Sequence, residues 1–191
     1  MKLRESIERY QPFDNEEEEI KKNILKYMDK YSDVLTRNND KCHFTSSGIV
    51  LNKERTKVLM VFHNIYNSWI VPGGHADGDS DLLLVALKEV EEETGQKATV
   101  LDKNIFQLSI SPIEGHMKRG KYVEPHYHLD VLYLLEADDT IPLVYREDES
   151  QGVKWATIDE SLDEDITVPF MHSVQKRIVD KLIREGFINK Y

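Results

Sequence analysis

A glycine turn that leads into an acid-ended helix constrains this chain more than any other feature. Residues 73–95, GGHADGDSDLLLVALKEVEEETG, join a Gly-Gly pair to a predicted helix that carries four glutamates near its end. Three of them, Glu89, Glu92 and Glu93, stand at i, i+3 and i+4, so their carboxylates share one helix face. Hard divalent cations such as Mg²⁺ and Mn²⁺ prefer oxygen ligands of this kind. The segment therefore predicts a helix that presents a metal site.

The alternative interpretation of these acids is a solvated helix face, which is what most acidic runs form. Angular positions at about 100° per residue separate the two cases. Leu82, Val85 and Ala86 continue the glutamate stripe as an apolar surface towards the start of the helix. We therefore expect the carboxylates at the rim of a packed cleft, with Glu91 pointing elsewhere. The expected core face is the neighbouring stripe of Leu83, Leu87, Val90 and Thr94.

The same segment resembles the Nudix box, Gly-x5-Glu-x7-Arg-Glu-U-x-Glu-Glu-x-Gly-U, in which U is a bulky aliphatic residue. Gly74 matches the opening glycine, residues 88–93 match the central hexapeptide, and Gly95 matches the last glycine. The preceding Trp-x-x-Pro-Gly-Gly segment also fits, and the resemblance extends over roughly residues 43 to 160. It implies an α/β fold: a Nudix-type α/β/α sandwich with a mixed sheet, in which the box forms a loop–helix–loop.

Three positions depart from the consensus. Ser80 stands where the family has its first glutamate, Lys88 replaces the arginine, and Gln96 replaces the final aliphatic residue. Lysine keeps the positive charge but lacks the planar fork with which arginine holds a carboxylate. Asp79 or Asp81 could compensate for the missing glutamate. In the other interpretation, Asp79 or Ser80 simply caps the helix.

The resemblance implies how the acids divide their roles. Mg²⁺ (or Mn²⁺) would be bound by Glu89, Glu92 and Glu93 and would orient a water for attack on phosphorus. One carboxylate that the metal does not saturate, Glu89, Glu93 or Glu149, would act as general base. Lys88 would orient a glutamate and moderate the local negative charge.

Glu149 is a candidate because the resemblance implies a further metal-binding or basic glutamate in the loop before a tryptophan-containing strand. It lies six residues before Trp155, and Glu147 is the alternative in the same loop. Loop carboxylates are often only solvated, which is the other interpretation.

Histidines supply a second group of candidates. His126, His128 and Asp130 alternate along a predicted strand and therefore point to one face. Two imidazoles and a carboxylate can bind a transition metal; structural histidines or substrate contacts are the alternatives. Gly74 and the adjacent His75 belong to the box loop, so together with His128 they are the expected substrate-binding residues.

Two weaker sets could also contact a nucleotide. A short basic cluster consists of Lys118, Arg119 and Lys121. It could contact a phosphate group, or it could be solvated surface. Aromatic residues that could stack on a base, or belong to the core, are Tyr66, Trp69 and Tyr127.

The charge of the chain limits its partners. A formal net charge of −10 and a pI near 5.2 disfavour binding to a nucleic-acid backbone. A phosphorylated small molecule can still bind if divalent cations supply the positive charge. The single cysteine, Cys42, excludes an intramolecular disulfide and a cysteine-based zinc site, and is expected to act as a small core hydrophobe. Neither a signal peptide nor a membrane-length apolar run is evident, so we expect a cytoplasmic address and no membrane partner.

Periodicity divides the chain into a helical extension, residues 1–40, and a Nudix domain with a C-terminal helix, residues 41–191. In the extension, the pair Asp14-Asn15 is expected to cap a helix over residues 16–31. A final helix is expected over residues 170–185, with Gly186 as its stop. The expected strands span residues 44–51, 57–63, 69–71, 98–101, 105–110, 127–135 and 152–158, and residues 112–121 are expected to form a loop.

These features predict a divalent-metal-dependent hydrolase that cleaves a diphosphate linkage in a nucleoside diphosphate-linked substrate. The alternative is a Nudix ligand-binding or regulatory module with little turnover, which Ser80 and Lys88 motivate. An isopentenyl-diphosphate isomerase is disfavoured, because the resemblance implies a catalytic cysteine and Cys42 lies well before the box. The resemblance also leaves a homodimer open, since dimers are common in the family.

Overall fold

A mixed β-sheet forms the centre of the molecule. The structure is a computed structural model that describes residues 3–64, 67–118, 120–145, 150–165 and 167–189. Within these residues, eight strands form one sheet whose main order is β10-β2-β1-β9-β5, while β3, β4 and β6 pair with β2, β1 and β9. The strands of this sheet are β1 (Cys42–Asn52), β2 (Lys57–His63), β3 (Ser68–Ile70), β4 (Gly73–His75), β5 (Thr99–Val100), β6 (Gln107–Ile113), β9 (His126–Ala137) and β10 (Ser150–Thr157).

The long parallel pair of β1 and β9 decides which side chains face which layer. Their register runs without interruption from Cys42 opposite Tyr127 to Asn52 opposite Ala137. Because side chains alternate along a strand, even-numbered residues of β1 and odd-numbered residues of β9 line one face of the sheet. On one face Phe44 and Leu129 belong to a core shared with the box helix, and on the other Ile49 and Leu134 belong to a second core.

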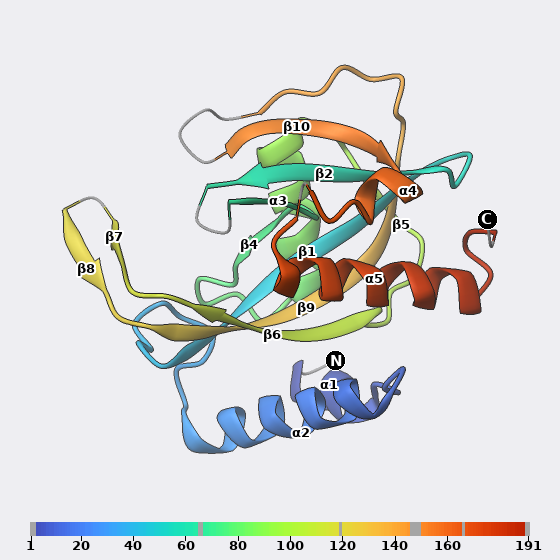
Figure 1. The fold of residues 1–191 in the computed structure, drawn as a ribbon. Coiled ribbons are helices and arrows are strands. Elements are labelled where there is room, and N and C mark those ends of the chain that lie inside the picture. Colours follow the sequence, from blue (N-terminus) through green and yellow to red (C-terminus); the bar gives the residue numbers. More distant parts are fainter. Residues whose placement is uncertain (1–2, 65–66, 119, 146–149, 166, 190–191) are drawn as a thin grey trace.

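Helices cover both faces of this sheet (Figure 1). The box helix, α3 (Leu82–Thr94), packs against β1 on the first face, and α5 (Pro169–Arg184) packs on the second face through Ile178, Val179 and Leu182. The short α4 (Ile158–Ser161) follows β10. The predicted α/β Nudix fold, with a mixed sheet between helices, is therefore confirmed.

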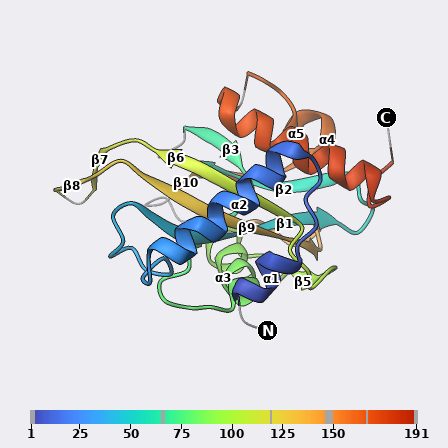
Figure 2. The same ribbon diagram turned by 90° about the horizontal axis from the view of Figure 1, so that it is seen from below.

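Two helices precede the sheet, as expected. α1 (Leu3–Arg9) and α2 (Asn15–Lys30) lie together beneath β6 and β9, and α2 crosses β6 obliquely (Figures 1 and 2). Ile7 and Ile24 are fully buried and belong to the same core as the box helix. Asp14 caps α2 by accepting a hydrogen bond from the Glu17 N–H, as predicted for the Asp14-Asn15 pair. The division of the chain at residue 40 stays a prediction.

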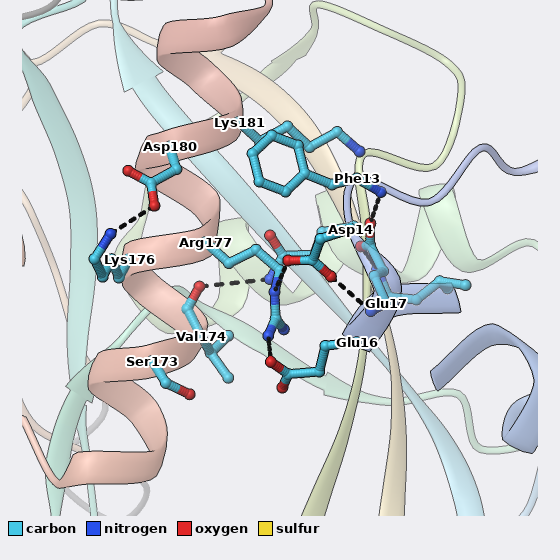
Figure 3. A network of polar contacts seen from close by, with 12 residues as sticks. Phe13, Asp14, Glu16, Glu17, Ser173, Val174, Lys176, Arg177, Asp180 and Lys181 are labelled. Carbon is cyan, nitrogen blue, oxygen red and sulfur yellow. Dashed lines mark hydrogen bonds and ion pairs between the residues drawn. The ribbon is translucent and has the colours of Figure 1, made fainter. Parts of the chain in front are cut away.

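Polar contacts fix the start of α2 to the sheet and to α5 (Figure 3). The buried Glu17 carboxylate accepts hydrogen bonds from the Phe13 N–H at 2.6 Å and from the Leu108 N–H of β6 at 3.0 Å. Arg177 of α5 pairs with Asp14 at 3.3 Å and with Glu16 at 2.5 Å. The contacts of Glu17 with Leu108 and of Arg177 with α2 and its cap join segments more than 90 residues apart in the sequence, so they are part of the tertiary fold.

The box helix differs from the prediction in two respects. Its buried apolar residues are Leu82, Val85, Ala86 and Val90, whereas Leu83 and Leu87 are only half-buried. The core stripe is thus rotated towards the side that carries the glutamates. The predicted cap was also wrong: Asp81, and neither Asp79 nor Ser80, accepts the Leu84 N–H and caps the helix.

The other predicted helices and strands agree with the structure to within a few residues at most of their ends. One predicted loop does not. The final helix ends just before Gly186, whose φ of 76° lies in the left-handed region that glycine tolerates. The predicted loop over residues 112–121 was wrong, because β6 continues to Ile113 and a projecting hairpin follows. This hairpin consists of β7 (His116–Lys118) and β8 (Lys121–Val123).

Cys42 is buried in the core as expected, and burial raises the pKa of its thiol to about 11.

Candidate active site

A cavity of about 710 Å³ opens between the end of the box helix, the second face of the sheet and the start of α5. The strand register explains its polar lining: Thr45 lies opposite Asp130 across β1 and β9, and Ser109 of β6 lies opposite Asp130 from the other side. Small hydroxyl side chains at these positions leave room where larger core residues would fill the space. The cavity therefore begins where the apolar core of this face ends.

The glutamates of the box helix reach the cavity from one end. Glu89, Glu92 and Glu93 all line it, together with Lys88. Glu93 is buried, and its Oε2 accepts a hydrogen bond from the Gly73 N–H at 2.9 Å. This bond joins the end of the helix to the glycine turn that opens the box segment, residues 73–95.

Gly74 is required by the position of Glu89. A Cβ atom at residue 74 would lie 2.5 Å from Glu89 Oε2 and 2.6 Å from Oε1, much closer than side-chain atoms can approach. Any residue with a side chain would displace the carboxylate. The glycine turn thus allows the backbone of β4 to pass directly beside Glu89.

Lys88 and the other charged residues of the helix lie further out. Lys88 pairs with Glu92 at 3.5 Å across one helical turn, and both side chains are largely exposed. Glu91 is exposed, pairs with Lys97 at 3.7 Å, and does not line the cavity, as expected for the acid that points elsewhere. Ser80 is also exposed and outside the cavity lining.

Neither aspartate beside Ser80 reaches the cavity either. Asp79 and Asp81 are exposed, and both are used locally: Asp79 accepts the Asp81 N–H at 2.9 Å, and Asp81 caps the helix. In this structure neither carboxylate stands in for the missing glutamate.

Asp130 provides a further acid in the cavity wall. Its carboxylate accepts hydrogen bonds from Thr45 Oγ1 at 3.0 Å and from Ser47 Oγ at 2.8 Å. Burial raises the pKa of Asp130 to about 6, although these two hydroxyl donors act in the opposite direction. Asp130 therefore changes charge near neutral pH.

Four histidines cluster beside Asp130. His43 of β1 lies next to His128 of β9 in the sheet register, with ring centroids 5.0 Å apart. His75 of β4 lies 4.9 Å from His128 and 5.2 Å from His43, and His126 lies 4.8 Å from His43. The expected trio of His126, His128 and Asp130 does not form a cluster of its own, because the Asp130 carboxylate accepts hydrogen bonds from the hydroxyls of Thr45 and Ser47.

The aromatic wall of the cavity comes from β3. Trp69 is half-buried and lines the cavity, with Lys154 Nζ 4.5 Å from its ring centroid and Phe62 packed edge-on against it. Tyr127 is exposed and lies against Tyr27 of α2 instead. Of the proposed stacking residues, Trp69 lines the cavity.

Comparison with known proteins identifies the family. The family model of the NUDIX domain matches residues 43–179, well over half of the chain. The chain belongs to the Nudix family. A Nudix hydrolase from Clostridium perfringens has the same fold, with a TM-score of 0.51 and 20% identity over 73% of this chain and 97% of that one.

Two further relatives of this Nudix chain have specific names. It is 30% identical over 139 residues to an RNA pyrophosphohydrolase of Pelagibacter ubique, covering 70% of this chain and 87% of that protein. It is 28% identical over 120 residues to a CMP-5'-(N-acetyl-N-hydroxy-3-aminopropyl)phosphonate hydrolase of Streptomyces rubellomurinus. That match covers 60% of this chain and 52% of the relative, so the Nudix chain spans about half the length of the phosphonate hydrolase.

The donor set fits the divalent metal on which Nudix proteins typically depend. Three glutamates line the cavity, and the glycine beside Glu89 gives that carboxylate the space that a Cβ atom would take. Oxygen donors of this kind suit Mg²⁺ or Mn²⁺.

Among the described helices, none is long and apolar enough to cross a membrane.

Some predicted site residues lie outside the described residues: Glu147, Glu149, Tyr66 and Arg119. Four other cavity residues were missed from the sequence, namely Thr45, Ser47, Ser109 and Ser111, and so was His43 of the neighbouring histidine cluster. The signal that could have found them is polar alternation within strongly β-forming segments, since HisPheThrSerSer and GlnLeuSerIleSer place polar side chains at every second position.

Proposed function

We propose that this Nudix protein is a divalent-metal-dependent hydrolase that cleaves a diphosphate linkage in a nucleoside diphosphate-linked substrate. The observation that carries the proposal is the arrival of Glu89, Glu92 and Glu93 at one end of a cavity with polar and aromatic walls. A cavity of about 710 Å³ lies within the range of small-molecule sites.

The three glutamates would hold Mg²⁺ or Mn²⁺. When bound, the metal supplies positive charge that neutralises the diphosphate and activates a water. The hydrogen bond from Gly73 holds the Glu93 carboxylate at the cavity, and the close packing against Gly74 holds Glu89. Fixed carboxylates of this kind bind without first losing side-chain freedom.

A carboxylate that the metal does not saturate would take the proton from the attacking water, and Glu89, Glu93 or Glu149 is proposed for this role. Lys88, held near Glu92 at 3.5 Å, would moderate the negative charge of the cluster. Gly74, His75 and His128 line the cavity and are proposed to contact the substrate.

The aromatic wall supports a nucleoside as part of the substrate. Trp69 offers a half-buried ring with Lys154 close to its face, so a base could stack beside it while the diphosphate faces the glutamates. The two relatives are named as an RNA pyrophosphohydrolase and as the hydrolase of a CMP-5'-phosphonate, and both names therefore include a nucleotide or a chain of nucleotides.

A panel of nucleoside diphosphate derivatives, incubated with Mg²⁺ or Mn²⁺ and followed by ³¹P NMR, tests the proposal. The Glu93→Gln variant should lose at least about 100-fold in kcat, because the metal and the general base share this cluster. Glu91→Gln is the matched control, since it removes a charge from the same helix outside the cavity. Full activity of Glu93→Gln would overturn the assignment.

A second candidate is a ligand-binding or regulatory Nudix module with little turnover. It is favoured by Ser80, which is exposed where the family has a glutamate, and by the local use of Asp79 and Asp81. Calorimetric binding of a diphosphate compound at saturating Mn²⁺, without phosphate products in the NMR spectrum, would support this module instead.

A further inference from the structure

The histidine cluster provides a donor set that differs from the carboxylates of the proposed hydrolytic site. His43, His75 and His128 each offer one ring nitrogen, and these three atoms lie within 4.8 Å of one another. They come from three strands, β1, β4 and β9, whose mutual register is fixed by backbone pairing. The cluster therefore belongs to the rigid part of the fold.

The hydrogen bonds of His43 direct a lone pair into the cluster. Its Nδ1 lies 3.1 Å from the Asn39 carbonyl oxygen, and because a carbonyl can only accept, this nitrogen carries the hydrogen. Nε2 then carries the lone pair. His43 is only 4% exposed, and Nε2 is buried without a hydrogen-bond partner. A buried acceptor without a partner costs free energy, which a cation would recover.

His126 repeats this arrangement at the next position. Its Nδ1 lies 2.8 Å from the Glu124 carbonyl oxygen, so its Nε2 carries the lone pair, which points at His128 Nε2 at 3.3 Å. Donation of the second ring N–H to a backbone carbonyl is the usual outer contact of metal-binding histidines, because it fixes the tautomer and the ring orientation. His128 Nε2 must then donate its hydrogen to His126, so Nδ1 is the nitrogen of His128 that carries the lone pair, and His126 acts as an outer contact that orients the His128 ring.

The charge state of the cluster suits a metal as well. Burial lowers the pKa of His43 and lowers that of His128 further, with the neighbouring imidazoles adding to the effect at His128. Imidazoles bind metal ions in their neutral form. His43 and His128 can therefore pack against each other without the repulsion that two protonated histidines would exert.

From these contacts we infer that His43, His75 and His128 form a binding site for a transition-metal dication of the Zn²⁺ class, separate from the glutamate site. Imidazole nitrogens select such ions over Mg²⁺, which prefers oxygen. Tetrahedral Zn–N bonds of about 2.0–2.1 Å place ligand nitrogens about 3.3 Å apart, so binding requires the rings to move together by roughly an ångström.

A metal at this position would face the cavity. His75 and His128 both line it, so a fourth ligand position would be accessible to water or to an anionic group of a substrate. The site would then add positive charge to this wall of the cavity. In this inference, His75 and His128 contact an anion through a cation rather than directly.

Co²⁺ provides the experimental probe, because nitrogen-bound tetrahedral Co²⁺ absorbs visible light much more strongly than octahedral oxygen-bound Co²⁺. The full chain is titrated with Co²⁺ in excess Mg²⁺, and Zn²⁺ is then added in competition. One equivalent with a tetrahedral spectrum that Zn²⁺ displaces is expected. The absence of binding, or an octahedral spectrum alone, would overturn the inference.

Two ligand variants and two controls locate the ion. His43→Phe and His75→Ala should each weaken Co²⁺ binding by at least 10-fold, whereas His172→Gln, on α5 outside the cavity lining, should leave binding unchanged. Glu93→Gln should also leave the tetrahedral spectrum unchanged, which separates this site from the hydrolytic one. Circular dichroism verifies folding. If the buried His43 variant does not fold, the half-buried His75 variant decides, and wild-type affinity in that folded variant contradicts the site.

Discussion

The backbone N–H of Gly73 donates to Glu93 Oε2 at 2.9 Å, although the two residues are 20 positions apart. The bond closes the box segment into one unit, with the glycine turn at one end and the acidic helix end at the other. Because the turn also pairs with β1 through Ser47 and Ser46, the position of the carboxylates is set by the sheet. Changes in the turn should therefore act on the acids directly.

Gly74→Ala tests this link. Its Cβ would meet the Glu89 carboxylate at 2.5–2.6 Å, so we expect at least a 10-fold loss of metal-dependent activity, with a smaller effect on stability because the displaced carboxylate is the end of a flexible side chain. Activity assays at increasing Mg²⁺ and chemical denaturation measure the two effects. Gly78→Ala is the control, because a Cβ there meets nothing within 4 Å and only the left-handed backbone is strained. Equal activity of the two variants would contradict the role of Gly74.

Gly48→Ala should destabilise the protein without a direct effect on the acids. A Cβ at residue 48 would lie 2.6 Å from Val90 Cγ2 and 2.8 Å from Leu135 Cδ1, so the helix and sheet would be overpacked at a cost of about 1–3 kcal/mol. Combining it with Val90→Ala should cost less than the sum of the single changes, since the smaller side chain makes room. Urea denaturation of the four proteins measures this coupling, and strict additivity would argue against the contact.

Asp130 should make stability depend on pH. Its pKa is raised from 3.8 to about 6 in the folded state, so the folded protein holds this proton more tightly than the unfolded chain. This contribution is fully present below about pH 3.8 and is lost as the pH rises through 6, with an upper limit of about 3 kcal/mol.

Asp130→Asn removes this titration. From pH 4 to pH 7, the unfolding free energy of the wild type should fall relative to that of the variant. Denaturation curves at closely spaced pH values provide the measurement. Parallel pH profiles for the two proteins would show that Asp130 titrates normally.

Glu17→Ala should weaken the attachment of the N-terminal helices. It leaves the N–H groups of Phe13 and Leu108 without their carboxylate acceptor, and we expect a loss of about 3 kcal/mol. Limited proteolysis should then cut within the first 30 residues sooner than in the wild type. Glu19→Ala, an exposed acid on the same helix, should change stability by no more than about 0.5 kcal/mol. Equal losses for both variants would contradict the role of the buried carboxylate.

The sequence predicted the common side of the three glutamates because their spacing is local. Glu89, Glu92 and Glu93 are separated by one helical turn, so helix periodicity alone brings them to a common side. The placement of Asp81 as the cap was missed because Asp79, Ser80 and Asp81 are all good capping residues, and their choice depends on where the loop meets the sheet.

The histidine cluster could not be predicted in the same way. Alternation along β9 placed His126 and His128 on one face, but His43 and His75 join them through pairing between strands that are distant in the sequence. The register of a parallel pair is set by the whole fold, and no local pattern reports it. The β7–β8 hairpin was missed because glycines and a proline in that stretch are equally typical of an irregular loop.

The contacts of Glu17 also bear on how copies of this protein behave towards one another. Within the part of the chain that the structure describes, β6 pairs with β9 on one side only, so its other side presents backbone groups to which a strand from another molecule could add. Glu17 accepts the Leu108 N–H on that side, while Tyr10 and Lys181 donate to the Phe106 carbonyl just before the strand. These two backbone groups are therefore already satisfied within the chain, so the start of this edge offers fewer partners for strand addition, and the N-terminal helices and the segment between them supply groups that satisfy it.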